Sequence, residues 1–291
     1  MLKNLPCLIS KSKSSSINAI FRIVSKGQSF SPDHFLMKHL IFILLSLNIL
    51  QPAKAIGFYQ PGDTLYIWAV SGLTLRKEAS LKAAKLATIP YGTLVVAQNY
   101  GGGDKVEVEA VPAHSSDAQK SPAVMLEGSF AQVIFQGDTG YVFDGYLSKL
   151  PALKQVNAPN DRPDFEDFDV WAKRNFRLVA EQKSGVAEYG SYHTAKQVYA
   201  NGFSRDNWVE KSGQSRFILP DVSLEEAFLF FNYLHNYEWD IRHPSKERGA
   251  TQWIHSQVNK YEWRFENINC AYKILYLPEE KMTVMTSVCS C

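Results

Sequence analysis

The first half of this 291-residue chain is organised around short apolar stretches separated by glycine turns. In chain order they are Gly72-Leu73-Thr74-Leu75-Arg76, Phe130-Ala131-Gln132-Val133-Ile134-Phe135, Gly140-Tyr141-Val142 and Tyr146-Leu147. Side chains also alternate in character from Leu65 to Val70, as expected of a half-buried strand. Short strands broken by glycine turns predict a small all-β barrel or sandwich over residues 60–150.

The order of these stretches resembles that of bacterial SH3-like (SH3b) domains. The matching positions are Thr74-Leu75-Arg76, Gly92, Phe130 with Val133, Gly140-Tyr141-Val142 and Tyr146-Leu147. Phe130 and Tyr141 stand where tryptophan is usual in the family. The resemblance implies an SH3-like barrel over residues 63–148. It also implies a place in the cell envelope, with peptidoglycan or a protein as the partner and Phe130, Tyr141 and Tyr146 as ligand contacts.

Residues 99–128 interrupt this predicted barrel. Gly101-Gly102-Gly103-Asp104 is not followed by the Gly-Lys-Ser/Thr of a phosphate-binding loop, so it predicts a flexible turn. His114-Ser115-Ser116-Asp117 holds the residue types of a catalytic triad, but their adjacency in a Pro- and Ser-rich stretch is composition rather than geometry. We expect a mobile hairpin that proteases cut early, together with the linker at 151–163.

The N-terminal 55 residues have the pattern of an export signal. Met37-Lys38-His39 precedes an apolar run from Leu40 to Leu50, and Ala53-Lys54-Ala55 is a small-residue cleavage site. The run is short for a membrane span. We therefore predict cleavage after Ala55, favour Met37 as the translation start, and expect an extracytoplasmic protein that is periplasmic or secreted.

Net charge argues against nucleic acid as a partner. The formal charge of +2 depends on seven Lys and Arg against one acid in the first 55 residues. The remaining chain has 24 basic and 28 acidic residues, a net charge of −4. Phosphate-backbone binding requires a basic surface, so we expect no nucleic-acid partner. No motif calls for a cofactor.

The second half, residues 163–291, predicts an α+β domain of two helices against an antiparallel sheet. Acids from Asp164 to Asp169 precede basic residues at the end of a first helix, which complements the helix dipole; the run lacks the Gly and distal Glu of a calcium loop. Ser223 and Glu226 form a capping box for a second helix that reaches about Tyr237. Short alternating runs before and after that helix predict strands.

The chemistry-bearing residues do not add up to a known active site. Cys270 has no histidine after it, whereas cysteine peptidases that accompany SH3b domains carry the histidine base later in the chain. A cluster of His235, Glu238, Asp240 and His243 has no recognised zinc spacing, so we expect no metal there.

Aromatic residues give the remaining indication of a binding surface. Trp208, Trp253 and Trp263 lie in predicted strands, where an exposed row would stack on sugar rings or hold an extended peptide. The alternative, that they form the core, is the more common fate of such side chains.

The predicted strands at 272–277 and 282–288 also suggest a disulfide. If Leu277 faces Met282 across the four-residue loop, Cys270 faces Cys289 at a distance that suits a disulfide, and Cys291 is left over. We therefore expect a Cys270–Cys289 bond in an oxidising compartment.

Together these features favour an exported, non-enzymatic envelope protein that binds peptidoglycan or a protein partner. Two alternatives stay open, a cell-wall hydrolase with an unrecognised active site in the C-terminal half and a structural partner in a surface complex.

Overall fold

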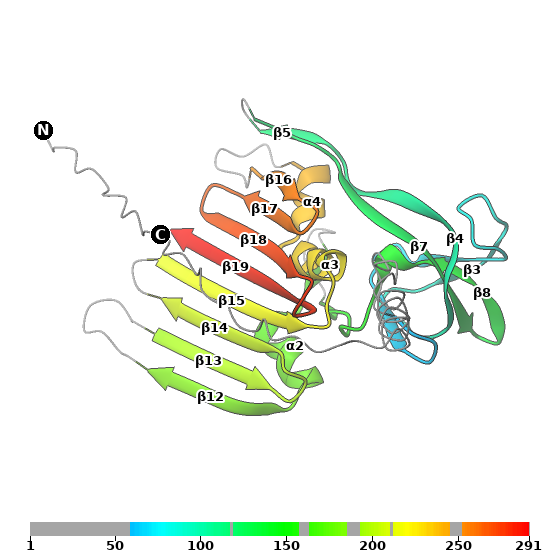
Figure 1. The fold of residues 1–291 in the computed structure, drawn as a ribbon. Coiled ribbons are helices and arrows are strands. Elements are labelled where there is room, and N and C mark those ends of the chain that lie inside the picture. Colours follow the sequence, from blue (N-terminus) through cyan, green and yellow to red (C-terminus); the bar gives the residue numbers. More distant parts are fainter. Residues whose placement is uncertain are drawn as a thin grey trace, which may run out of the picture. The chain divides into compact units, whose positions relative to one another are not determined.

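The computed structural model describes residues 59–116, 119–156, 163–184, 193–209, 212–244 and 252–290. The predicted export segment and Cys291 lie outside these residues. Within them the chain is mostly β, every strand pairing is antiparallel, and helices are few (Figure 1). None of the described helices is both long and apolar enough to cross a bilayer.

The first half forms a seven-stranded sheet. Its strand order is β3-β2-β8-β7-β4-β1-β9. The strands are β1 (Thr64–Ile67), β2 (Leu73–Arg76), β3 (Lys85–Ile89), β4 (Leu94–Val111), β7 (Val124–Phe135), β8 (Asp138–Phe143) and β9 (Leu147–Ser148), with the short 3-10 helix η1 (Asp144–Tyr146) before β9. Strands β3 and β9 end the sheet without pairing to each other in the described residues. A closed barrel, which the sequence predicted, is therefore not observed.

Alternation along these strands gives the sheet an apolar face of its own. Leu65, Ile67, Leu75, Val95 and Val133 each expose 2% or less of their surface and belong to one buried cluster. Leu75 and Val133 come from two of the apolar stretches between glycine turns, which therefore contribute to this cluster.

The segment 99–128 is a hairpin, as predicted, but it is not free of the rest of the protein. Strands β4 and β7 extend past the sheet as a long antiparallel ladder, and β5 (His114–Ser116) and β6 (Gln119–Ser121) close its far end (Figure 1). Ala110, Val111, Val124 and Leu126 are buried in a cluster shared with the second half. The sequence did not indicate this packing, because the surface that covers these apolar residues is distant in the sequence.

The second half forms an eight-stranded sheet in the order β12-β13-β14-β15-β19-β18-β17-β16. The strands are β12 (Leu178–Ser184), β13 (His193–Tyr199), β14 (Ser204–Val209), β15 (Ser212–Pro220), β16 (Ile254–Asn259), β17 (Glu262–Glu266), β18 (Cys270–Leu277) and β19 (Met282–Ser290). Two four-strand meanders thus meet at the β15–β19 pair. A separate two-stranded ladder joins β10 (Gln155–Val156) to β11 (Asp164–Phe165).

Helices α2 (Phe168–Asn175) and α3 (Leu224–His235) begin where the sequence indicated. Asp167 caps α2, because its carboxylate accepts a hydrogen bond from the Val170 N–H at 2.9 Å. The predicted capping box of α3 is confirmed: Ser223 and Glu226 bond reciprocally. A third helix, α4 (Tyr237–Arg242), follows directly.

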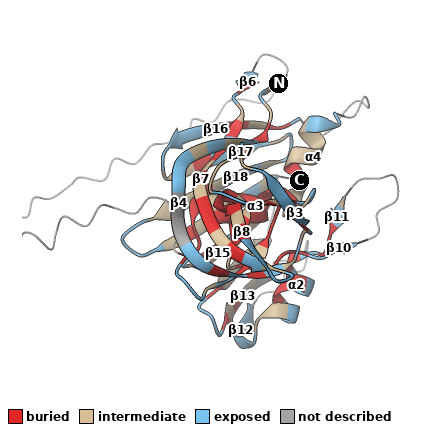
Figure 2. Cartoon of the chain, turned by 90° about the vertical axis from the view of Figure 1, so that its right-hand side faces the viewer, coloured by how far each residue is buried: buried red, intermediate tan, exposed pale blue. Residues whose placement is uncertain are grey.

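Helix α3 is almost entirely covered, and Figure 2 shows it in the colour of buried residues. Phe228, Phe230 and Phe231 each expose 1% or less of their surface. Their cluster includes Trp68 and Phe143 from the first sheet as well as residues of the second sheet. One aromatic core therefore joins the two halves of the described chain through α3.

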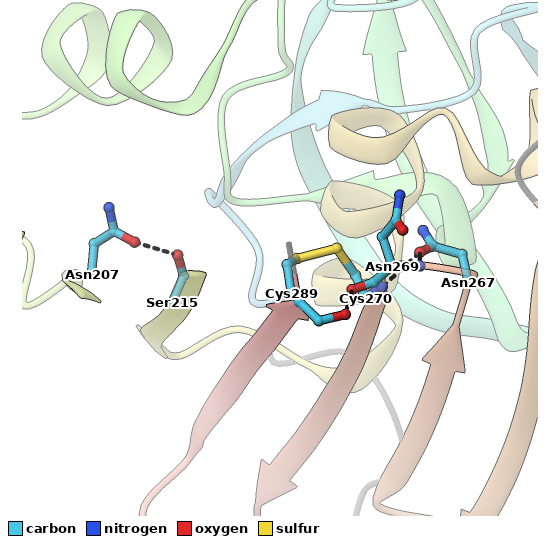
Figure 3. Close-up of a disulfide and its surroundings, with 7 residues drawn as sticks. Asn207, Ser215, Asn267, Asn269, Cys270 and Cys289 are labelled. Atoms are coloured by element: carbon cyan, nitrogen blue, oxygen red, sulfur yellow. Dashed lines mark hydrogen bonds between the residues drawn. A yellow bond between two sulfur atoms is a disulfide. The ribbon is translucent and has the colours of Figure 1, made fainter. Parts of the chain in front are cut away.

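Strands β18 and β19 pair in the predicted register. Leu277 lies opposite Met282, and Cys270 lies opposite Cys289. These two cysteines form a disulfide with an S–S distance of 2.09 Å, at the end of the sheet shown in Figure 3. The loop length before Met282 was thus sufficient to predict which cysteines meet.

Candidate ligand-binding site

A cavity of about 580 Å³ lies where the first sheet meets the end of α3 and the start of α4. The turn between β1 and β2, from Ala69 to Gly72, forms one wall, and Phe143 and Tyr146 continue it. Asn232, Tyr233 and the α4 residues form the opposite wall. The site is thus built from segments that are far apart in the sequence.

Gly72 allows the turn that forms the first wall. Its φ of +82° lies in the left-handed region, which side chains other than glycine rarely adopt. An added Cβ would also lie 2.6 Å from the Cγ2 of Thr88 on the neighbouring strand. Glycine is therefore required here for both backbone and packing reasons.

Asn236 separates the two helices at the opposite wall. Its φ of +53° ends α3 and turns the chain into α4, a role that suits asparagine. The side-chain oxygen of Asn232 accepts a hydrogen bond from the Glu238 N–H at 2.8 Å and fixes the junction. The Oδ1 of Asn236, another lining residue, is buried without a hydrogen-bond partner among the described residues. This amide oxygen is an unused acceptor at the wall.

Three charged side chains line the cavity: Arg76 from the first sheet, and Glu238 and Arg242, which form an ion pair. The Nε of Arg242 donates to Glu238 at 2.8 Å, one helical turn away, and its Nη2 donates to the carbonyl oxygen of Ala110 at 3.3 Å. Burial, with the nearby Glu238 carboxylate as the second cause, raises the pKa of Tyr146 to about 12. The Tyr146 phenol therefore stays protonated and can donate or accept a hydrogen bond at neutral pH.

Aromatic rings, among them Tyr233 and Trp239, line the cavity. Trp239 stacks on His243 with ring centroids 3.8 Å apart, and Tyr233 stacks on Trp68 at 5.8 Å. Partly exposed Trp239 and the exposed Val70 offer apolar surface to a ligand. A mainly apolar hollow with a few fixed polar groups is typical of a small-molecule or peptide site.

The structure divides the aromatic residues that the sequence proposed as ligand contacts. Phe130, Trp253 and Trp263 expose 1%, 3% and 7% of their surface and belong to the core. The prediction that they present a face to ligand does not match this burial. Tyr146 lines the cavity, whereas Tyr141 and Trp208 are partly exposed elsewhere.

The residues considered as metal ligands have different partners in the structure. Glu238 pairs with Arg242, and the Asp240 carboxylate accepts from the indole N–H of Trp253 at 3.2 Å. His235 packs against Tyr272 and lines a different cavity. Within the described ranges, no three His, Cys, Asp or Glu side chains lie close enough together to hold a metal ion.

The histidines and cysteine considered for catalysis have structural contacts. His114 Nε2 lies 3.0 Å from the carbonyl oxygen of Trp253, and Asp117 lies outside the described residues. Cys270 is bonded to Cys289, and the Nδ1 of His255 lies 2.6 Å from the Tyr237 hydroxyl.

Comparisons with protein-family models, with curated proteins and with solved structures find no match to this chain. The site is accordingly defined by its own geometry. Sequence reasoning missed Asn232, Asn236 and Trp239. The one local signal was an asparagine at the expected end of an apolar helix, a common helix stop.

Proposed function

We propose that the mature chain is an exported, non-enzymatic binding protein of the cell envelope. Its first half is proposed to be an SH3-like module, and the 580 Å³ cavity beside it is proposed to take the ligand. Export is supported by the apolar run and the Ala53-Lys54-Ala55 site. Envelope binding is supported by the resemblance to SH3b domains.

The observation that carries the binding role is the composition of the cavity wall. Trp239, Tyr146 and Val70 offer apolar faces, and the Glu238–Arg242 pair offers charge of both signs. Aromatic faces stack on sugar rings, and the polar groups would orient amide or hydroxyl groups of the ligand. Peptidoglycan combines sugar rings with a short peptide, so it is the ligand we favour over an envelope protein.

Sedimentation with purified peptidoglycan tests this proposal, using the chain from Ile56 to Cys291 because the two halves share a core. We expect the wild-type protein to pellet with the wall and Trp239→Ala to remain in the supernatant. Trp208→Ala is the matched control, since Trp208 is also partly exposed but lies on β14 away from the cavity. Equal retention of the two variants would show that this cavity does not bind the wall.

The same preparation separates the hydrolase alternative. Release of labelled soluble fragments from the wall by the wild-type chain would indicate turnover and contradict a purely binding role. Absence of both retention and release would contradict peptidoglycan as the ligand and leave a protein partner to be sought by cross-linking.

A further inference from the structure

A second cavity of about 240 Å³ lies between the eight-stranded sheet and the helices α2 and α3. The two cavities share no lining residue. Phe231, Leu234 and His235 of α3 line the second cavity, whereas Asn232 and Tyr233 of the same helix line the first. The remaining apolar lining of the second cavity comes from Phe168, Phe217, Ile274 and Met285. The volume equals that of about eight water molecules at liquid density. This size suits a compact organic molecule.

Besides Lys273, which also lines this mainly apolar space, Arg205 brings a positive charge to it. Its guanidinium carbon lies 4.7 Å from the ring centroid of Phe168 and 5.5 Å from that of Phe217. These cation–π contacts hold the group against the cavity wall. The Nη1 atom donates to the exposed carboxylate of Asp169 at 2.8 Å. The Nε atom is buried and has no hydrogen-bond partner among the described residues.

That unpartnered Nε is unusual because buried donors on a charged group are normally paired, and leaving one without an acceptor is energetically costly. A guanidinium stays charged at any physiological pH, so it cannot relieve the cost by losing a proton. No aspartate or glutamate is among the described residues that line the cavity. An acceptor from outside the chain would therefore meet an unused donor.

Other polar groups lie at the same cavity. Burial lowers the pKa of His235 to about 4, so its ring is neutral at pH 7 and offers one N–H donor and one acceptor nitrogen. Ser215 and Ser287 also line the space. The Ser215 hydroxyl donates to the Asn207 side chain at 2.8 Å, which keeps its oxygen available as an acceptor (Figure 3).

We propose that this second cavity binds a small organic anion, a carboxylate with a compact aromatic or branched aliphatic body. The carboxylate accepts the Nε–H of Arg205, and the body packs against Phe217, Phe231 and Ile274. Charge-assisted hydrogen bonds of this kind are the strong ones, and the apolar lining excludes water from them. This site is separate from the proposed wall-binding cavity and does not depend on its role.

Benzoate is a suitable probe because it is small enough to enter the cavity and carries one carboxylate on a compact aromatic ring. Titration of sodium benzoate into the chain from Ile56 to Cys291, followed by calorimetry or ligand-observed NMR, should show saturable binding with a Kd of about 1 mM or lower. Benzamide has the same shape without the charge. We expect it to bind about tenfold more weakly, as loss of one charge-assisted hydrogen bond implies.

Variants locate the binding. Arg205→Gln should weaken benzoate binding about tenfold, whereas Arg216→Gln should leave it unchanged. Arg216 is the matched control, since it pairs with Asp206 in the neighbouring register position and points to the other face of the sheet. Leu234→Trp, which fills the cavity without changing charge, should abolish binding and covers the case in which Arg205→Gln fails to fold.

The proposal is overturned if wild-type protein shows no saturable benzoate binding at about 10 mM, a concentration tenfold above the weakest expected Kd. It is equally overturned if benzamide binds as well as benzoate, or if folded Leu234→Trp binds benzoate with wild-type affinity.

Discussion

The carboxylate of Glu226 accepts hydrogen bonds from the hydroxyl of Ser148 and from the backbone N–H of Lys149, each at 2.9 Å. Ser148 ends the last strand of the first sheet, and Glu226 lies in the first turn of α3. The other carboxylate oxygen accepts from the Ser223 N–H at 2.9 Å and completes the capping box. One buried side chain therefore both starts α3 and ties it to the first sheet.

We expect Glu226→Ala to lower the free energy of unfolding by about 3 kcal/mol, because it leaves buried donors of Ser148, Lys149 and Ser223 without an acceptor. Glu279→Ala, in an exposed turn, should change it by less than about 0.5 kcal/mol. Urea unfolding at pH 7 measures both. A loss for Glu226→Ala no larger than that of the control would show that this carboxylate does not join the two halves.

The hairpin β4–β7 depends on the alternation of its side chains. Leu126 is completely buried, whereas its neighbour Met125 is 38% exposed. Leu126→Ala should therefore destabilise the protein by about 3 kcal/mol, because it opens a cavity in the shared core, and Met125→Ala should cost less than about 1 kcal/mol. Urea unfolding of the two variants checks this. Similar small losses would mean that the hairpin is not packed as described.

Acid should weaken the contact between this hairpin and the second sheet through His255. The backbone N–H of His255 donates to the Ser121 hydroxyl on β6, and the His255 ring lies against His114 with centroids 5.4 Å apart. Burial, and then the neighbouring His114, lowers the pKa of His255 to about 4. Between pH 6.5 and 4 the unfolded chain therefore binds more protons at this residue than the folded one does, and stability falls as pH falls.

For His255 alone this linkage removes about 2 kcal/mol between pH 7 and pH 5. His255→Phe keeps a ring beside Tyr237 and Phe265 but cannot be protonated. We expect it to be less stable than the wild type at pH 7 and to lose about 2 kcal/mol less on going to pH 5. Urea unfolding at the two pH values gives the difference. Parallel pH dependence in both proteins would contradict a neutral, buried His255.

The disulfide is open to a direct test. Non-reducing peptide mapping of the native protein should recover Cys270 linked to Cys289. Replacing both by serine should lower stability by about 3 kcal/mol, as expected for a closed loop of this length. A Cys270–Cys291 linkage would instead show a shifted register in solution. The variant with serine at both cysteine positions must be compared with the oxidised wild-type chain, because reduction of the wild type breaks the same disulfide.

Local features of the fold were predictable because neighbours in the sequence determine them. The four residues from Pro278 to Lys281 set the β18–β19 register, and Ser223 with Glu226 marked the start of α3. The packing of the β4–β7 hairpin against the second half was not predictable, although the residues from Val106 to Glu109 alternate as a strand in the sequence. Alternation gives a buried face but not its partner, and the partner here, around Trp253 and Tyr237, lies more than a hundred residues away.

The candidate site was harder to predict for the same reason. Glu238 appeared in the sequence as a possible metal ligand, yet its role depends on Arg242 and on the carbonyl of Ala110, which only the folded hairpin brings near. Trp253 and Trp263 were considered from the sequence as members of an exposed aromatic row and proved to be core residues. Aromatic residues in a strand are compatible with a place in the core and with an exposed ligand contact, and only their burial in the structure distinguishes the two.

Trp68 makes the dependence of the first half on the second measurable. Its ring exposes no surface, stacks on Tyr233 at 5.8 Å and lies 6.2 Å from Phe230, both of which belong to α3. The cluster around Leu65 and Val95 is internal to the first sheet and does not need α3. We therefore expect an isolated fragment of residues 56–150 to keep a β-sheet circular dichroism spectrum while it exposes Trp68.

Trp68 is the single tryptophan of that fragment, so its fluorescence reports this exposure directly. Emission should be red-shifted and readily quenched by acrylamide, because removing α3 leaves the indole in water. Adding separately produced residues 151–291 should restore blue emission and protection, since these residues carry Tyr233 and Phe230. A Trp68→Phe fragment gives the background. Blue, protected emission from residues 56–150 alone would show that the first half is an independent domain and that the shared aromatic core is not needed to bury Trp68.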